Sequence, residues 1–241
     1  MIKKIHYVWI GNNPKPEKVE KCIASWREKC PNYEIIEWNE SNYDINKCKY
    51  AKLAYQDKKY AFASDFMRFD ILYNYGGIYL DTDVELLKDV TPLLNSNFMG
   101  FERAGEVAPG LIMYSSPQNF IIKQVLDYYY AFNDDKINYD YTVCNIVTDI
   151  LLNKGLTKED KPQQIEDFTI YPTEYFNPKG GSYGKDKITK NTYCIHHYMA
   201  TWKSKEAQKL MEYKVKYGVK KGKLLFSLVH PFLAFKIIRK K

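Results

Sequence analysis

Two acidic residues, Asp81 and Asp83, lie two positions apart in a run where apolar and polar residues alternate. Residues two apart on a β-strand project from the same face of the sheet, so both carboxylates are expected to leave it together. Oxygens placed in this way suit a hard cation such as Mn²⁺ or Mg²⁺. Such a cation stabilises the charge on a leaving diphosphate. A solvated acidic strand face has the same pattern, so the motif needs support from its surroundings.

A charged pair, Asp65 and Arg68, precedes this strand. Residues 61–75 carry apolar side chains nearly all round a helix, which predicts a buried helix. Asp65 and Arg68 are three positions apart and therefore share one face of that helix. Buried charges are costly unless they are paired or bound to a ligand. The spacing is consistent with an internal ion pair and equally with a ligand-binding site.

The segments that must position these residues alternate between strand and helix. Residues 2–10 form a β-rich run, a helix is expected between Pro16 and Pro31, and Glu34–Trp38 is predicted as a second strand. The buried helix ends at Gly76-Gly77, a C-cap signal, and leads into a strand over residues 78–87. This order predicts a βαβ unit and an α/β fold with a mainly parallel sheet.

Further elements are expected beyond residue 100. The pattern favours helices over residues 120–132 and 141–152 and strands over residues 168–172 and 192–197. Residues 177–184 are rich in Gly and Pro and are expected to form a loop.

Composition indicates one globular domain and argues against several protein classes. The chain has 241 residues, 45% of them apolar, which suffices for one large core. Its five cysteines are odd in number, widely spaced and outside any C-x-x-C pattern, which argues against a disulfide framework or a zinc site. A reducing cytosol fits this cysteine usage, and the first residues do not resemble a secretory signal.

The C-terminal residues carry most of the positive charge. Residues 203–241 contain 12 Lys and Arg against 2 Asp and Glu, whereas the preceding part is slightly acidic. The apolar stretch Leu224–Phe235 is interrupted by His230-Pro231 and is too short to span a bilayer. We expect a basic amphipathic helix in residues 206–241, after a domain over residues 1–205, that lies on an anionic membrane surface. Packing on the domain or on a second copy is the alternative, and no nucleic-acid motif is present.

Several runs together resemble one enzyme family, the glycosyltransferases of family 32. The resemblance extends over about residues 1–205 and is most specific in Ala63-Ser64-Asp65-Phe66-Met67-Arg68 and in Leu72-Tyr73-Asn74-Tyr75-Gly76-Gly77-Ile78-Tyr79-Leu80-Asp81-Thr82-Asp83-Val84-Glu85. It also includes Lys4-Ile5-His6-Tyr7-Val8-Trp9-Ile10-Gly11, Cys22-Ile23-Ala24-Ser25-Trp26, Tyr33-Glu34-Ile35-Ile36-Glu37-Trp38-Asn39, Tyr171-Pro172 and Phe176-Asn177-Pro178. The resemblance implies a GT-A fold with a Rossmann-like, mixed, mainly parallel sheet flanked by helices.

The same resemblance implies roles for individual residues. Trp9 would stack on the base of the donor, and Asp65 and Arg68 would hold hydroxyls of the transferred sugar, with Ser64 beside them. Asp81 would contact ribose and sugar, and Asp83 would bind Mn²⁺ directly, with Asp81 contributing directly or through water. The catalytic residues expected are therefore Asp65, Arg68, Asp81 and Asp83, and the donor-binding residues expected are Trp9, Ser64, Asp65, Arg68, Tyr79, Asp81, Asn145, Thr201 and Trp202.

The segment from His196 to Trp202 resembles the closing part of the family's site, where a polar residue completes the metal shell. Imidazole binds Mn²⁺ well. Neighbouring residues on a strand point to opposite faces, so one of His196 and His197 is expected to serve. We favour His197, because an aromatic residue follows it as in related enzymes. Thr201 and Trp202 would cover the diphosphate.

One segment departs from the family pattern. Relatives often carry Thr-Gly-Pro before an apolar pair, whereas this chain has Thr142-Val143-Cys144-Asn145-Ile146-Val147-Thr148. Asn145 is expected to reach the donor sugar from this region.

These expectations describe a retaining, metal-dependent glycosyltransferase. It would move a hexose from a nucleotide-sugar donor, preferably a UDP-sugar, using Mn²⁺ or Mg²⁺. The acceptor would be a glycan or a lipid-linked saccharide in surface polysaccharide biosynthesis, at the inner face of the plasma membrane. The alternatives are an effector-like transferase that modifies a protein and a non-catalytic nucleotide-sugar binding module. No nucleic-acid partner is expected.

Overall fold

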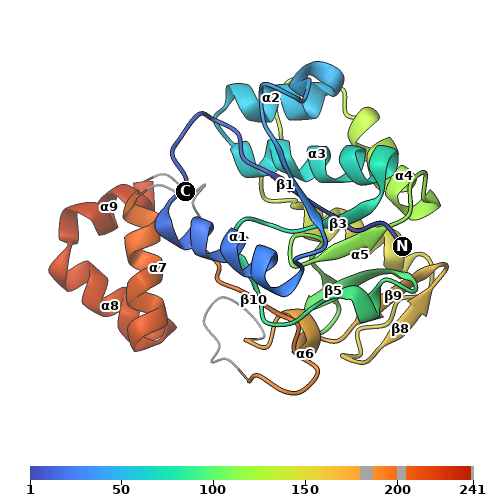
Figure 1. Cartoon of the computed structure of the whole chain (residues 1–241). Helices are drawn as coiled ribbons and strands as arrows, with labels where there is room; N and C mark the ends of the chain where they lie inside the picture. Colours follow the sequence, from blue (N-terminus) through green and yellow to red (C-terminus); the bar gives the residue numbers. More distant parts are fainter. Residues whose placement is uncertain (180–186, 200–204, 240–241) are drawn as a thin grey trace.

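The protein is an α/β structure with a helical extension at its C-terminus, and the computed structural model describes residues 1–179, 187–199 and 205–239 (Figure 1). The strands are β1 (Lys4–Val8), β2 (Glu34–Trp38), β3 (Gly77–Tyr79), β4 (Val84–Leu86), β5 (Asn97–Arg103), β6 (Glu106–Val107), β7 (Met113–Ser115), β8 (Gln163–Ile165), β9 (Phe168–Tyr171) and β10 (Cys194–His196). The helices are α1 (Glu17–Lys29), α2 (Lys49–Gln56), α3 (Tyr60–Tyr75), α4 (Phe120–Tyr130), α5 (Val143–Leu152), α6 (Thr173–Phe176), α7 (Lys205–Tyr217), α8 (Val219–Val229) and α9 (Pro231–Arg239), with short 3₁₀ turns at Ile45–Lys47 and Thr91–Leu93.

The main sheet has the strand order β2-β1-β3-β7-β5-β9-β8, and β6 pairs with β5. Strands β2, β1 and β3 are parallel, β7 is antiparallel to both of its neighbours, and β9 is parallel to β5 while β8 reverses. Along this path β2, β1, β3, β5 and β9 therefore run in one direction. This confirms the predicted α/β class with a mixed, mainly parallel sheet.

Helices cover both faces of this sheet and create two cores. Successive residues of a strand point to opposite faces, so Ile5 and Tyr7 join the cluster that contains Trp26 of α1, while Val8 joins the cluster built on helices α2 to α5. Helix α3 is the central helix of the second cluster, and ten of its sixteen residues are buried. It ends at Gly76, whose φ of 62° places it in the region that glycine tolerates. The predicted buried helix over residues 61–75 is confirmed.

The predicted strand over residues 78–87 is wrong in its centre. Residues 78–79 belong to β3 of the main sheet, and residues 84–86 form β4, which pairs with β10 in a separate two-stranded sheet. A turn joins the two, closed by a hydrogen bond from the Val84 N–H to the Asp81 carbonyl at 3.1 Å. Helix α1 holds β4 in place, because Trp26 Nε1 donates to the Val84 carbonyl at 2.7 Å.

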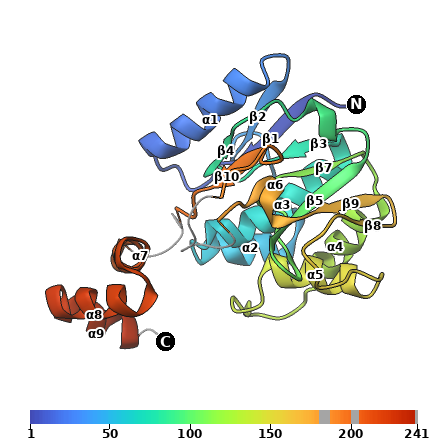
Figure 2. The ribbon, with the colours of Figure 1, turned by 90° about the horizontal axis from the view of Figure 1, so that it is seen from below.

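The C-terminal segment is helical as predicted, but it forms three helices where one was expected. Helices α7, α8 and α9 pack chiefly on one another, to one side of the sheet (Figures 1 and 2). Gly222 permits a close α7–α8 crossing, since a Cβ there would lie 2.4 Å from the Tyr213 carbonyl oxygen. Within the described residues no helix is both long and apolar enough to cross a bilayer.

Candidate functional site

A buried arginine on α3 connects the helix to the acidic turn. Arg68 Nη2 lies 2.7 Å from Asp65 Oδ1 and 3.2 Å from Asp81 Oδ1, and the Arg68 side chain is 4% exposed. The pair Asp65 and Arg68 shares one helix face as predicted, and the second contact brings that face to Asp81. The internal ion pair is therefore present, and it borders the D-x-D turn.

Tyr79 and Gly110 complete the surroundings of this arginine. The Arg68 guanidinium carbon lies 4.8 Å from the centre of the Tyr79 ring, and Tyr79 hydrogen-bonds to Asp81. The Gly110 carbonyl accepts the Asp81 N–H at 3.0 Å. A Cβ at Gly110 would lie 2.0 Å from Asp81 Oδ2 and 2.9 Å from Arg68 Nη1. The absent side chain is thus what lets Asp81 and Arg68 meet, and no sequence pattern had singled out Gly110.

Burial and pairing compete in setting the charges of this group. Desolvation raises the pKa of Asp65 above its usual value, and the Arg68 charge opposes the rise. Desolvation likewise raises the pKa of Asp81, again against Arg68. Two carboxyl groups thus share one guanidinium in a low-dielectric region. A cation or a cluster of sugar hydroxyls is the kind of ligand that such a region favours.

The second carboxylate of the motif, Asp83, faces the C-terminal strand. His196 Nε2 lies 3.1 Å from Asp83 Oδ1, and the Met199 N–H donates to Asp83 Oδ2 at 2.8 Å. Burial disfavours the charged carboxylate, but His196 and the Met199 N–H outweigh it and hold the pKa of Asp83 at about 2. Burial also disfavours a charged imidazole, yet Asp83 and Asp81 raise the pKa of His196 above its usual value.

The structure places His196, and not the expected His197, next to the acidic side chains of the motif. His197 Nε2 lies 2.8 Å from Glu85 Oε2, while the His197 backbone N–H donates to the Asp83 carbonyl at 2.9 Å. His196 is the residue whose ligand atom lies with those of Asp81 and Asp83, all within 4.8 Å of one another. The geometry agrees with the alternation argument and makes His196 the candidate ligand, whereas the aromatic residue that follows His197 had favoured His197.

The residues present fit a divalent cation. The group combines two carboxylates with one imidazole, and both kinds of donor bind divalent ions. His196 Nδ1 is buried without a hydrogen-bond partner in the part of the chain that the structure describes. A second group with ligand atoms equally close, Glu102, Glu106 and Cys144, lies on β5, β6 and α5.

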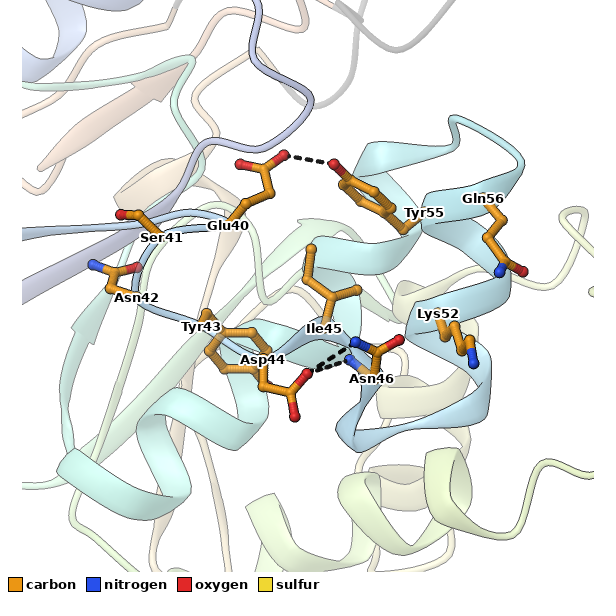
Figure 3. Close-up of a pocket in the computed structure, with 10 residues that line it drawn as sticks. All are labelled: Glu40, Ser41, Asn42, Tyr43, Asp44, Ile45, Asn46, Lys52, Tyr55 and Gln56. Atoms are coloured by element: carbon orange, nitrogen blue, oxygen red, sulfur yellow. Dashed lines mark hydrogen bonds between the residues drawn. The ribbon is translucent and has the colours of Figure 1, made fainter.

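Two neighbouring pockets lie where β1 and β2 end, at the same sheet edge as Asp81. Trp9, Lys15 and Asn39 line one pocket, and Figure 3 shows the other, between the end of β2 and helix α2. Glu40 borders both, and its Oε1 accepts the Gly11 N–H at 2.6 Å and the Tyr55 hydroxyl at 2.9 Å. Ligands of parallel sheets bind at the carboxyl ends of the strands. Trp9 is therefore placed at the edge where a nucleotide is expected.

The remaining predicted donor residues have different positions. Ser64 Oγ donates to the Ala61 carbonyl and lies 3.4 Å from Arg68 Nη2, so it borders the arginine cluster. Asn145 Oδ1 accepts the N–H and the hydroxyl of Thr142 and so caps helix α5. Thr201 and Trp202 lie outside the described residues.

Residues 16–99, from α1 to the start of β5, match the family described as the glycosyltransferase sugar-binding region containing the DXD motif. The matched part includes Asp65, Arg68, Asp81 and Asp83, whereas Trp9 and His196 lie outside it.

The curated relatives are similar to this chain over only a small part of their own length. Subversion of eukaryotic traffic protein A of Legionella pneumophila is 31% identical over 34% of this chain and 17% of that protein. Inositol phosphoceramide mannosyltransferase 3 of Schizosaccharomyces pombe is 36% identical over 39% of this chain and 27% of that protein. The chain thus covers less than a third of the length of these relatives.

Among solved structures, the PaToxG glycosyltransferase aligns with a TM-score of 0.51 at 22% identity, over 64% of this chain and 70% of that one. At that identity the likeness establishes the fold. The family match and the fold agree with the resemblance drawn from the sequence. Residues 16–99 therefore match the DXD-containing sugar-binding region of glycosyltransferases, and the chain around them has the fold of a solved glycosyltransferase.

Proposed function

We propose that the chain transfers a hexose from a nucleotide-sugar donor to an acceptor hydroxyl, with retention of anomeric configuration and dependence on Mn²⁺. The observation that carries the proposal is the convergence of Asp81, Asp83 and His196 beside the buried pair of Asp65 and Arg68. The pair of Asp83 and His196 beside the cluster of Asp65, Arg68 and Asp81 forms a site for a cation and a polyhydroxyl ligand.

In this proposal each side chain has a defined task. Asp65 and Arg68 hold hydroxyls of the transferred sugar, because both groups stand rigidly on a buried helix. Asp81 contacts ribose and sugar from the turn, and Asp83 and His196 bind the metal, with Asp81 joining them directly or through water. Trp9 stacks on the base, and the preference for a UDP-sugar rests on that stacking. A bound divalent ion would neutralise charge on the departing diphosphate.

The arrangement supports a transferase better than a glycoside hydrolase. A hydrolase needs one carboxylic acid and one carboxylate free to flank the scissile bond. Here the Asp65 and Asp81 carboxylates pair with Arg68, and Asp83 pairs with His196. Electrostatic stabilisation of the leaving group is then the main catalytic contribution. Retention needs no further carboxylate if a phosphate oxygen of the donor accepts the proton of the incoming hydroxyl.

For the acceptor we propose a glycan or a lipid-linked saccharide of surface polysaccharide biosynthesis, reached at the inner face of a membrane. The support is the C-terminal unit, where α8 and α9 expose Leu224, Leu228, Val229 and Phe232, the last being 86% exposed. Lys220, Lys221 and Lys223 lie exposed beside them. Apolar and basic groups side by side suit an anionic bilayer surface. Two such basic units would repel each other, which disfavours pairing with a second copy.

The experiment that tests the donor chemistry is thermal unfolding with UDP-glucose, UDP-galactose, UDP-N-acetylglucosamine and GDP-mannose, each with and without Mn²⁺. A ligand at 100 times its dissociation constant stabilises a protein by about 2.7 kcal/mol. We expect one UDP-sugar to raise the melting temperature in the presence of Mn²⁺, and Asp83→Asn to abolish the metal-dependent part. Glu85→Gln is the matched control, since Glu85 pairs with the other histidine. No shift with any donor would refute the proposal.

A second candidate function is the glycosylation of a protein, and the observation behind it is the likeness to a Legionella protein named for the subversion of eukaryotic traffic. Incorporation of label from the donor separates the two acceptors. Label in the lipid-extractable or polysaccharide fraction of a membrane preparation supports the first proposal. Label that stays on protein after lipid extraction supports the second. Donor binding without any hydrolysis or transfer in the presence of Mn²⁺ would instead indicate a binding module.

A further inference from the structure

Tyr198 has an unusual backbone between two contacts to the acidic turn. Its φ is 51°, in the left-handed region that bulky residues rarely adopt. The residue two positions before it, His196, pairs with Asp83 through its side chain, and the next residue, Met199, donates its N–H to the same carboxylate. Because Tyr198 turns the chain here, both groups can reach one carboxylate. Strained conformations of this kind persist where the surroundings determine them.

The side chain of Tyr198 is held by two residues from other elements. The Asn177 amide donates to the Tyr198 hydroxyl at 2.6 Å, and that hydroxyl donates to the Glu102 carboxylate. Asn177 Nδ2 also donates to the Glu102 carbonyl at 2.7 Å, which ties the two partners together. The Tyr198 ring lies 4.1 Å from the His196 ring, centre to centre. The Tyr198 hydroxyl is therefore held by Asn177 and Glu102, while the Tyr198 ring contacts His196, the candidate metal ligand.

The position of Asn177 follows from its neighbours in the chain. Asn177 and Phe176 are both fully buried, and the ring of Phe176 packs against β5 at Gly100. A Cβ at Gly100 would lie 2.3 Å from that ring, so the glycine makes room for it. This packing places Asn177 beside Glu102, two residues further along the same strand. The run Phe176-Asn177-Pro178, which no part of the proposed reaction uses, gains a structural task here.

We propose that Tyr198, Glu102 and Asn177 form a latch that positions His196 and the Met199 N–H on Asp83. The inference rests on the proposed function for its relevance to metal binding, but the latch itself is a statement about these three side chains. All three are positioning residues and act through His196 and Asp83. Without the hydroxyl contact, the left-handed backbone at Tyr198 loses its restraint, and the segment from His196 to Met199 is free to leave the acidic turn.

The test replaces the hydroxyl alone. Tyr198→Phe keeps the ring on His196 but removes both hydrogen bonds of the hydroxyl. We expect exchange of the Met199 amide hydrogen to become about fivefold faster and the Mn²⁺ affinity, measured as free Mn²⁺ by electron paramagnetic resonance, to fall about fivefold, since the closed state loses the hydrogen bonds of the hydroxyl. Tyr193→Phe is the matched control, because its ring stacks on Tyr175, away from the latch. It should leave both quantities unchanged.

A second variant distinguishes the loss of this contact from a general destabilisation of the fold. Glu102→Gln keeps the shape of the hydroxyl's acceptor but removes its charge, so it should shift both quantities in the same direction and by less. In the double variant with Tyr198→Phe the effects should not add, because both changes break the same contact. The latch proposal would be overturned if the Met199 amide hydrogen exchanges in Tyr198→Phe at the wild-type rate. It would also be overturned if the effects of Tyr198→Phe and Glu102→Gln add fully in the double variant. If the wild-type protein binds no Mn²⁺, the metal assignment fails, and the exchange measurement still decides on the latch.

Discussion

His196 Nε2 lies 3.1 Å from Asp83 Oδ1, and the two residues are 113 positions apart in the sequence. The side chain of the neighbouring His197 pairs with Glu85 at 2.8 Å. Two adjacent histidines and two acidic residues thus form two parallel pairs, one within the candidate metal site and one outside it. Replacing each histidine in turn therefore gives two variants with the same chemical change, one inside and one outside the candidate metal site.

The first prediction concerns these two histidines. His196→Ala should weaken Mn²⁺ binding at least about tenfold, the effect usual for losing a group that orients or binds a metal. His197→Ala should change the Mn²⁺ affinity less than twofold. The measurement is titration with Mn²⁺ followed by the paramagnetic resonance of the free ion. Equal losses in the two variants would contradict the assignment of His196.

The second prediction concerns the buried arginine. Arg68→Met should lower the free energy of unfolding by about 3 kcal/mol, because Asp65 and Asp81 are left without their buried partner. Arg103→Met is the control, since the Arg103 side chain is 67% exposed in its pair with Glu106, and it should cost less than about 1 kcal/mol. Urea denaturation measures both. Similar costs in the two variants would show that the Arg68 cluster contributes no more than a surface pair.

The third prediction concerns pH. Burial lowers the pKa of His6 to about 4 from its usual 6.5, while its ring accepts the Trp38 N–H and donates to the Gly76 carbonyl. Between these two values the unfolded chain binds a proton that the folded chain does not, so stability falls as the pH falls. We expect a loss of about 2 kcal/mol from pH 7 to pH 5.

His6→Gln isolates this contribution, because it removes the titrating group and retains an N–H donor. The variant should be less stable than the wild type at pH 7, and its loss between pH 7 and pH 5 should be smaller by about the same 2 kcal/mol. Urea denaturation at the two pH values provides the comparison. Parallel losses in variant and wild type would assign the pH dependence to other groups.

The fourth prediction concerns the exposed apolar face of the C-terminal unit. Flotation with vesicles containing phosphatidylglycerol should recover the wild-type protein in the lipid fraction, and Leu228→Ser with Phe232→Ser should abolish this. Phe120→Ser is the control, because Phe120 is 60% exposed on the sheet domain and should not contribute. Binding should weaken with salt, since the exposed lysines contribute about 1 kcal/mol each at an anionic surface. Equal flotation of all variants would show that a different surface binds the vesicles. If the wild-type protein does not float and forms dimers in solution, the exposed apolar face is a self-association surface.

The sequence predicted best where local periodicity and burial agree. Helix α1 begins one residue after Pro16, strand β2 spans Glu34–Trp38 as predicted, and helix α3 begins one residue before the predicted Ala61. A helix apolar on every side is stable only in the interior, so Asp65 and Arg68 were expected to be buried, either as an ion pair or against a ligand. That pairing was among the expected outcomes.

Long-range pairing set the limit of the prediction. Strands β5 and β7 were not predicted, and nothing local shows that β4 leaves the main sheet to pair with β10. Asp81 and Asp83 are therefore brought together by a turn, whereas the sequence pattern had predicted that both would project from one face of a continuous strand. Gly110 and Tyr198 act through backbone position, which a search for chemical side chains does not detect. A non-glycine residue with positive φ leaves no signature in the sequence.

The two-stranded sheet of β4 and β10 has a consequence for the newly made chain. The first half of the site, from Asp65 to Asp83, leaves the ribosome more than 100 residues before His196. Domains fold as units during synthesis. Until β10 has emerged and paired with β4, the candidate cation site lacks the His196 imidazole beside Asp83. The geometry of this candidate site can therefore form only after β10 has been made.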